Sequence, residues 1–184
     1  MLIHEPPLYL FPTNTLTLAN PIITQPITIR QLKFFAEKLS SLFEAGDTIL
    51  LEGGLGAGKT TFVQLIATNL EIGDEQYVSS PSFSLLHEYS GTLQVFHMDL
   101  YRLTDEDDVE AAGLLEYLEH QGLCLIEWPE RLGTAQPDNY LQIEMTIPDS
   151  EHRTLILTAC GPRWQKRQTR LVNIVDQVNK QVAQ

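Results

Sequence analysis

The amino-acid sequence predicts a single α/β domain with a mixed, mostly parallel central sheet flanked by helices, and with an extra C-terminal helix. Apolar runs typical of strands alternate along the chain with segments of helical periodicity, as they do in α/β proteins. Some strand candidates follow one another across a short turn, which indicates antiparallel pairs within the sheet. The 184 residues suffice for one domain with a core and are too few for two ordinary domains.

The first half of the chain predicts an extended lead-in, two helices and two strands. Residues 1–24 are rich in Pro, Thr and Asn and have no clear period. Apolar residues then recur at helical spacing from Leu32 to Phe43, and a Gly-Asp pair turns the chain into a short apolar strand. The elements expected here are a helix over 30–43, a strand at 48–52, a helix over 60–70 that ends near Gly73, and a strand at about 76–79.

The second half predicts two antiparallel pairs, one buried strand and two helices. Thr104 is expected to cap an acidic helix, whose carboxylates favour its positive N-terminal end. The segment GLCLIEW is apolar almost throughout, as strands buried in a parallel sheet are. The tail from Trp164 to Val182 places its apolar residues on one helical face. The expected elements are strands at 85–90 and 92–101 around Gly91, a helix over 105–120, a strand at 122–128, strands at 140–148 and 153–159, and the helix of the tail.

Composition and charge exclude some classes of function. The net charge is −12, although residues 163–184 hold five basic side chains against one acid. An acidic body argues against unaided nucleic-acid binding, because phosphate contacts need clustered Lys and Arg. No run of about 18 apolar residues exists, so we expect no membrane span, and the N-terminus lacks the features of a secretory signal. Cys124 and Cys160 lie in apolar runs without partners at metal spacing, which favours buried thiols, a reducing compartment and a cytoplasmic location.

The segment GGLGAGKT at residues 53–60 matches the phosphate-binding pattern G-x-x-x-x-G-K-[ST], with an apolar strand before it and a helical pattern after it. Glycines let the backbone curl so that successive N–H groups point at phosphate oxygens, and the helix start adds its positive dipole end. Lys59 would supply a charge to the β- and γ-phosphates, and the Thr60 hydroxyl would bind Mg²⁺. The nucleotide-binding candidates are Gly54, Leu55, Gly56, Ala57, Gly58, Lys59, Thr60 and Thr61.

These features predict a P-loop NTPase domain, and we divide the chain accordingly. The lead-in covers residues 1–24, the P-loop domain covers 25–162, and a basic amphipathic helix covers 163–184. This last helix could touch a nucleic acid or a protein partner through its basic side chains, although packing on its own domain is favoured.

Two acids that follow apolar runs could complete the site. Asp99 ends VFHMD and Glu127 ends LCLIE, the position of a second-strand acid beside a P-loop. The hydroxyl-rich loop SSPSFSL offers Ser82 as a ligand to the metal and γ-phosphate, or it is a plain turn. His87 and His97 lack a second ligand at metal spacing and are interpreted as core or surface histidines. Trp128 could stack on a base or a partner, or it could pack in the core.

Several segments occur together, in the same order, in one known family. They are GGLGAGKTTF, VSSPSFSLLHEY, FHMDLYRL, Gly113 beside an acidic helix, and LIEWPERL. They cover about residues 30–160, and their combination is highly specific although each short motif alone is not. On these motifs the chain resembles the TsaE family, bacterial ATPases that are required for threonylcarbamoyladenosine modification of tRNA.

The resemblance implies an activity that the motifs alone do not define. The family binds ATP with Mg²⁺ and hydrolyses it slowly alone. It acts with two proteins, TsaD and TsaB, which transfer the threonylcarbamoyl group to adenosine 37 of ANN-decoding tRNAs. Because another enzyme makes the threonylcarbamoyl-adenylate, the chain would use ATP hydrolysis to reset its partner complex and would meet tRNA indirectly.

The roles of the family's site residues can be assigned to the matching positions of this sequence. The resemblance implies that Thr60 and Glu127 ligate Mg²⁺, that Asp99 and Ser82 belong to the catalytic and switch surroundings, and that Arg153 reaches the nucleotide. The sequence also departs from the family, which usually has an acid where Gly54 stands and threonines where Ser82 and Ser84 stand. Serine keeps the hydroxyl, whereas Gly54 removes a charge beside the phosphates.

Three other functions remain as alternatives. A small P-loop kinase usually carries clustered arginines, but the stretch 61–152 has only Arg102 and Arg131. A GTPase would need an [NT]-K-x-D segment, and the Asn179-Lys180 pair is followed by Gln and Val. A scaffold that binds ATP without significant hydrolysis would carry the same P-loop, so the sequence separates it poorly from an ATPase.

Overall fold

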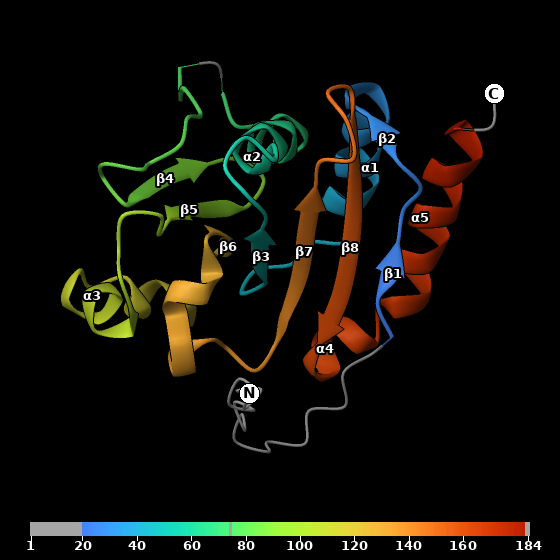
Figure 1. The fold of residues 1–184 in the computed structure, drawn as a ribbon. Coiled ribbons are helices and arrows are strands. Elements are labelled where there is room, and N and C mark those ends of the chain that lie inside the picture. The colour runs from blue at the N-terminus through green and yellow to red at the C-terminus, as the bar shows by residue number, and fades with distance from the viewer. Residues whose placement is uncertain (1–19, 74, 183–184) are drawn as a thin grey trace, which may run out of the picture.

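The strand that leads into the glycine loop lies in the middle of one mixed sheet (Figure 1). The computed structural model describes residues 20–73 and 75–182. The strand order is β1-β8-β7-β3-β6-β5-β4, and β2 also pairs with β8. The strands are β1 (Ile22–Ile23), β2 (Ile27–Thr28), β3 (Thr48–Glu52), β4 (Leu86–Ser90), β5 (Gln94–Asp99), β6 (Leu123–Glu127), β7 (Tyr140–Thr146) and β8 (His152–Cys160).

The four central strands β7, β3, β6 and β5 are parallel to one another. The outer strands pair antiparallel, β4 with β5, β8 with β7, and β1 and β2 with β8. This arrangement confirms the mixed, mostly parallel α/β sheet and both predicted antiparallel pairs. The helical elements are α1 (Ile29–Ser40), α2 (Lys59–Asn69), α3 (Glu106–Ala111), η1 (Leu115–Glu119), η2 (Pro129–Ala135), α4 (Gly161–Gln165) and α5 (Gln168–Val182).

The sheet is buried on both faces because its central strands are apolar at consecutive positions. Successive side chains of a strand point to opposite faces. Ile49 and Leu51 of β3 therefore join the core beneath α1, α2 and α5, whereas Leu50 joins a second core beneath α3, η1 and η2. The apolar character of GLCLIEW has the same cause, since all five residues of β6 are buried.

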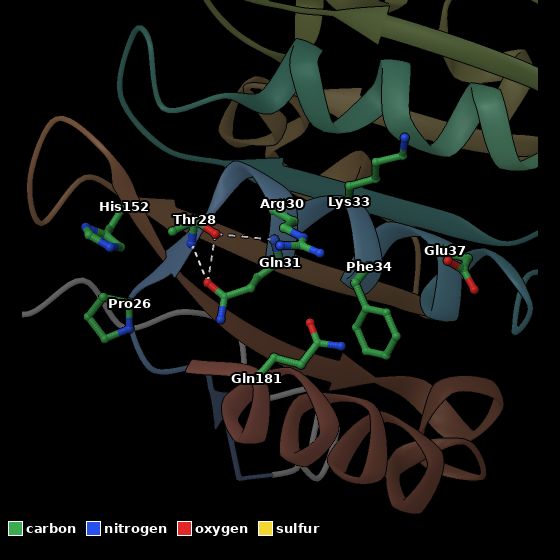
Figure 2. A pocket seen from close by; sticks show the side chains of 9 residues that line it. All are labelled: Pro26, Thr28, Arg30, Gln31, Lys33, Phe34, Glu37, His152 and Gln181. Atoms are coloured by element: carbon green, nitrogen blue, oxygen red, sulfur yellow. Dashed lines mark hydrogen bonds between the residues drawn. The ribbon is translucent and has the colours of Figure 1, made fainter. Parts of the chain in front are cut away.

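Helix α1 begins at a capping box. The Thr28 side chain accepts a hydrogen bond from the Gln31 backbone, and the Gln31 side chain accepts one from the Thr28 backbone (Figure 2). Two backbone donors that the first turn would leave unpaired are satisfied in this way. The box fixes where the chain passes from the short strand β2 into the helix that packs on α2.

Three sequence-based expectations about these elements are wrong. The strand expected at about 76–79 is irregular, because the Gln76 side chain binds the backbone N–H and C=O of Ser90 in place of a strand ladder. The acidic helix is capped by Asp105 instead of Thr104, since the Asp105 side chain accepts from the Asp108 backbone. That helix also stops at Ala111, where Gly113 has a left-handed φ of 72° and separates it from η1.

The predicted C-terminal helix is divided into α4 and α5, which meet at residues 166–167. Its apolar face is confirmed up to Val178, because the side chains concerned are buried in the core shared with α1. They are Trp164, Leu171, Ile174, Val175 and Val178. The side chain of Val182 and residues 1–19 of the expected lead-in lie outside the described part of the chain, in which Ile22 and Ile23 pair with β8. Within the same part of the chain, no helix is long and apolar enough to cross a membrane.

Both cysteine thiols are buried, as the sequence predicts, and we expect them to be chemically inert in the folded protein. Burial raises the pKa of Cys124 to about 12 and also raises the pKa of Cys160. At pH 8 almost no thiolate is then present to attack a disulfide reagent. Ellman's reagent should label neither thiol in native buffer and both in 6 M guanidinium, and rapid labelling in native buffer would contradict this burial.

Candidate functional site

The glycine loop joins the end of β3 to the start of α2, and Gly53 has to be a glycine. Its φ is 136°, and an added Cβ would lie 2.4 Å from the carbonyl oxygen of Met145 in β7. The first residue of the loop therefore passes so close to the neighbouring strand that no side chain fits. Gly54 differs, because an added Cβ would meet nothing within 4 Å.

This difference predicts that Gly53→Ala destabilises the fold, whereas Gly54→Ala does not. The clash with a backbone atom and the strained φ should lower the free energy of unfolding by about 1–3 kcal/mol or more. Gly54→Ala should stay within about 0.5 kcal/mol of the wild type. Urea denaturation of both variants measures the contrast, and an equal loss at the two positions would contradict the close approach to β7.

Lys59, the first residue of α2, folds back over the loop. Its Nζ donates to the carbonyl oxygens of Gly53 at 2.7 Å and Gly54 at 3.2 Å, and lies 4.0 Å from the centre of the Trp128 ring. Burial lowers the pKa of Lys59, and the nearby carboxylates of Glu127, Asp99 and Glu130 oppose this shift. The ammonium group is therefore held inside the loop. Of these three acids, Glu127 and Asp99 line the same cavity as Lys59 and could hold a metal.

The two strand-end acids lie side by side. Asp99 and Glu127 are register partners at the ends of the parallel strands β5 and β6, and both are almost completely buried. Glu127 Oε1 accepts a hydrogen bond from the Thr60 hydroxyl at 2.8 Å, which links β6 to the first turn of α2. The buried His97 of β5 lies 3.0 Å from the same oxygen through its Nε2. Acid, hydroxyl and P-loop lysine thus converge at one edge of the sheet.

The hydroxyl that binds Asp99 comes from Ser80. Ser80 Oγ donates to Asp99 Oδ2 at 2.5 Å, and the backbone N–H of Tyr101 donates to Oδ1 at 3.1 Å. The structure places Ser82, the candidate from the sequence, in the lining of the same cavity. The sequence indicated the serine loop as a whole, but only the path of its backbone shows which hydroxyl reaches Asp99.

Two cavities lie on either side of the glycine loop and share Ala57, Gly58 and Thr61. The first, of about 400 Å³, contains Lys59, Thr60 and both acids together with Ser80, Ser82, Tyr101, Arg102 and Trp128. The second, of about 460 Å³, is lined by Thr28, Ile29, Leu32, Ser150, Glu151 and Arg153 besides the shared residues.

Arg153 connects the second cavity to the loop itself. Its Nε donates to the carbonyl oxygen of Ala57 at 2.8 Å, and its Nη2 lies 3.4 Å from the carbonyl oxygen of Gly56. Arg153 thus supports the far side of the glycine loop from β8.

A larger cavity, of about 840 Å³, lies between α1 and the end of α5. Figure 2 shows its lining side chains, among them Arg30, Lys33, Phe34 and Gln181. It touches neither the glycine loop nor the two acids, so its size does not make it the site of phosphate chemistry. Of its lining residues, only Thr28 also belongs to the second cavity beside the loop.

The donor set at the first cavity fits Mg²⁺ better than a transition metal. Thr60, Glu127, Asp99 and the loop serines supply only hard oxygen atoms, which Mg²⁺ prefers. Among the residues that the structure describes, no cluster of three or more His, Cys, Asp or Glu could hold a metal. Mg²⁺ is commonly bound by one or two carboxylates together with substrate phosphates, and it does not need such a cluster.

The sequence also matches a known family over most of its length. The family described as "Threonylcarbamoyl adenosine biosynthesis protein TsaE" matches residues 28–155, which include the glycine loop, both acids and Arg153. The chain belongs to the TsaE family. The matched region begins at Thr28 and ends at Leu155 in β8, so β1, α4 and α5 lie outside it.

Individual TsaE proteins show the same relationship. The TsaE protein of Bacillus subtilis is 39% identical over 136 residues, covering 73% of this chain and 84% of its own. The TsaE protein of a Nostoc species is 37% identical and covers 72% and 89%. A crystal structure of Bacillus subtilis YdiB has a TM-score of 0.71 and 31% identity, covering 85% of this chain and 97% of that chain. The two TsaE relatives are named as tRNA threonylcarbamoyladenosine biosynthesis proteins.

Proposed function

We propose that the protein is a Mg²⁺-dependent ATPase of tRNA threonylcarbamoyladenosine biosynthesis. It would bind and hydrolyse ATP to drive or reset a TsaD–TsaB complex that modifies adenosine 37 of ANN-decoding tRNAs. The observation that carries this proposal is the pair of buried acids, Asp99 and Glu127, at the edge of the sheet where Thr60 and Lys59 begin α2. The match of residues 28–155 to the TsaE family supports the pathway in which this ATPase would act.

The residues of the first cavity would each have a different role in hydrolysis. Lys59 would exchange the carbonyl oxygens of Gly53 and Gly54 for β- and γ-phosphate oxygens, which offer its buried charge a better partner. Thr60 and Glu127 would hold Mg²⁺, which supplies positive charge to the phosphates. Asp99, oriented by the Ser80 hydroxyl and the Tyr101 N–H, would position the attacking water. Ser82 would lie close enough to contact the γ-phosphate.

The second cavity would take the ribose and adenine. Ile29 and Leu32 provide apolar surface for a base. Arg153 of β8, which donates to the carbonyl oxygen of Ala57 in the glycine loop, lines the same space. Because both cavities share Ala57, Gly58 and Thr61, one nucleotide could occupy them together, with its phosphates over the start of α2. Leu55, Gly56 and Gly58 would surround the phosphates.

The arrangement of arginines favours an ATPase over a kinase. The Arg102 guanidinium lies 3.9 Å from the centre of the exposed Phe83 ring, and Arg131 binds the carbonyl oxygen of Thr104. Of these two arginines, only Arg102 lines the first cavity. A kinase usually has a cluster of arginines there to neutralise the phosphoryl group being transferred. The energy of ATP would then be used on a protein complex, in the cytoplasm and away from membranes, with tRNA contacted through the partners.

Phosphate release from ATP tests the proposal directly. The purified chain should hydrolyse ATP slowly alone and much faster when the TsaD–TsaB complex of its own organism is added. EDTA should abolish both rates. Unchanged hydrolysis with the complex, together with phosphate transfer to a small acceptor, would replace this proposal with a kinase function.

A further inference from the structure

His97 is a buried titratable residue to which the hydrolytic mechanism above gives no role. It lies in the middle of β5 with an exposed fraction of 0%, and its Nε2 is 3.0 Å from Oε1 of Glu127, which is 3% exposed. Its neighbours Phe96 and Met98 point into the core under α3, so the imidazole points to the opposite face, toward α2. The ring is thus aimed from the sheet at the carboxylate beside the glycine loop.

The hydrogen bonds of the ring define which nitrogen carries the proton. His97 Nδ1 has no hydrogen-bond partner among the residues that the structure describes. A proton on Nδ1 would leave a buried N–H unpaired, which costs about 1–3 kcal/mol. A proton on Nε2 instead makes a hydrogen bond to the carboxylate. A ring with its proton on Nε2 therefore satisfies both groups best, and His97 acts as a donor to Glu127.

Two donors from different elements hold the same oxygen of Glu127. The Thr60 hydroxyl approaches Oε1 from α2, and the His97 ring approaches it from β5. Thr60 is the second residue of α2, directly after the glycine loop, where the proposed nucleotide and Mg²⁺ would bind. His97 belongs to a fully paired strand between β4 and β6, so its position does not depend on the loop.

We propose that His97 is a positioning residue that holds the Glu127 carboxylate in the orientation needed for Mg²⁺ and hydrolysis. The proposal rests on the proposed ATPase function. A Glu side chain has several rotatable bonds, so its carboxylate needs hydrogen-bond donors to hold it in one orientation. Because Glu127 is buried, a donor that is removed is not readily replaced by bulk water. Residues that bind a metal ligand from behind typically change metal affinity or activity by about 10–100-fold when they are removed.

Three substitutions separate positioning from simple packing. In His97→Gln the amide nitrogen can occupy the place of imidazole Nε2 and donate to Glu127. In His97→Asn the amide nitrogen reaches only the place of Nδ1, away from Glu127. His97→Leu removes the donor altogether. Gln and Asn have the same polarity, so their difference reports where the donor lies.

The measurements are the kcat and KM for ATP with the partner complex, Mn²⁺ affinity of the ADP-bound chain by electron paramagnetic resonance, and ADP affinity in EDTA. His97→Asn and His97→Leu should lower kcat and Mn²⁺ affinity by about 10–100-fold. His97→Gln should restore most of both. ADP affinity in EDTA should be unchanged in all three variants, because Lys59 and the loop amides remain.

Equal losses in His97→Gln and His97→Asn, or wild-type kcat and Mn²⁺ affinity in His97→Leu, would overturn the positioning role. Should His97→Leu fail to fold, the comparison of Gln with Asn still decides. A wild-type chain that never hydrolyses ATP, even with its partners, would instead refute the ATPase function. In that case the Mn²⁺ measurement would still test whether His97 orients Glu127.

Discussion

Replacing Glu127 with alanine is expected to abolish ATP turnover while nucleotide binding persists. The carboxylate lies beside Thr60 and Asp99 at the edge of the sheet, whereas the glycine-loop amides and Lys59 that grip phosphates come from α2 and its loop. Because Glu127 would hold the Mg²⁺ that stabilises charge on the phosphates, its removal should lower kcat by about 10²-fold or more, beyond the loss expected for a residue that only supports a metal ligand. Phosphate release and fluorescent-ADP binding, measured on the same preparation, separate the two effects.

Glu127→Gln and Glu130→Gln sharpen this test. Glu127→Gln keeps the side-chain volume and a carbonyl acceptor for Thr60, so a comparable loss would assign the effect to the lost charge. Glu130 lies three residues further along the chain, is exposed, and lines neither cavity beside the loop. Its glutamine variant should hydrolyse ATP within about twofold of the wild type, because exposed charges are screened. Unchanged turnover in Glu127→Ala would refute the assignment of Glu127.

Replacing Arg167 with methionine should cause a large loss of stability. Arg167, between α4 and α5, is buried and donates from Nη1 to Oδ2 of the buried Asp47 at 2.6 Å, and it also pairs with Glu44. Removing one partner of a buried ion pair costs about 3–5 kcal/mol because the remaining charge is left without compensation. Arg163 Nε lies 3.3 Å from the other Asp47 oxygen, so we expect the lower end of this range. Urea denaturation measures the change.

The matched control is Arg170→Met, which removes an exposed cation from α5 and should change stability by less than about 0.5 kcal/mol. The double variant Asp47→Asn with Arg167→Met should recover part of the loss, because no buried carboxylate remains unpaired. A similar loss of stability in Arg167→Met and Arg170→Met would show that the positive charge of the C-terminal helices, and not the buried pair of Arg167 with Asp47, is responsible.

The sequence predicts much of the central sheet because its strands carry strong local signals. The nearly continuous apolar residues of β3 and β6 indicate strands inside a parallel sheet. The two strands are parallel neighbours there, and their apolar side chains are buried. Asp99 and Glu127 could be predicted together, since residues that end neighbouring parallel strands lie at one edge. The glycine loop was equally evident, because its backbone geometry permits few residue types.

The rest depends on contacts between distant residues, which leave no local pattern. Ser80 reaches Asp99 only because of the path of a loop, and His97 reaches Glu127 only because β5 turns that side toward α2. The strand expected at 76–79 does not form, because the side chain of Gln76 hydrogen-bonds to the backbone N–H and C=O of Ser90. These contacts are set by the tertiary structure and not by composition or periodicity.

The two ends of the described chain meet, and this has a consequence for the order of folding. Strands β1 and β2 pair with β8, α5 packs on α1, and the backbone N–H of Gln25 donates to the Asn179 side chain. The central strand β3 likewise pairs only with β6 and β7, both of which follow it by more than 60 residues. Contacts of such long sequence separation form slowly, because a large loop has to close first. On the ribosome, neither the parallel sheet nor the core under α5 can be completed early, so a nascent chain of this protein exposes its apolar strands until β8 and α5 have also left the ribosome.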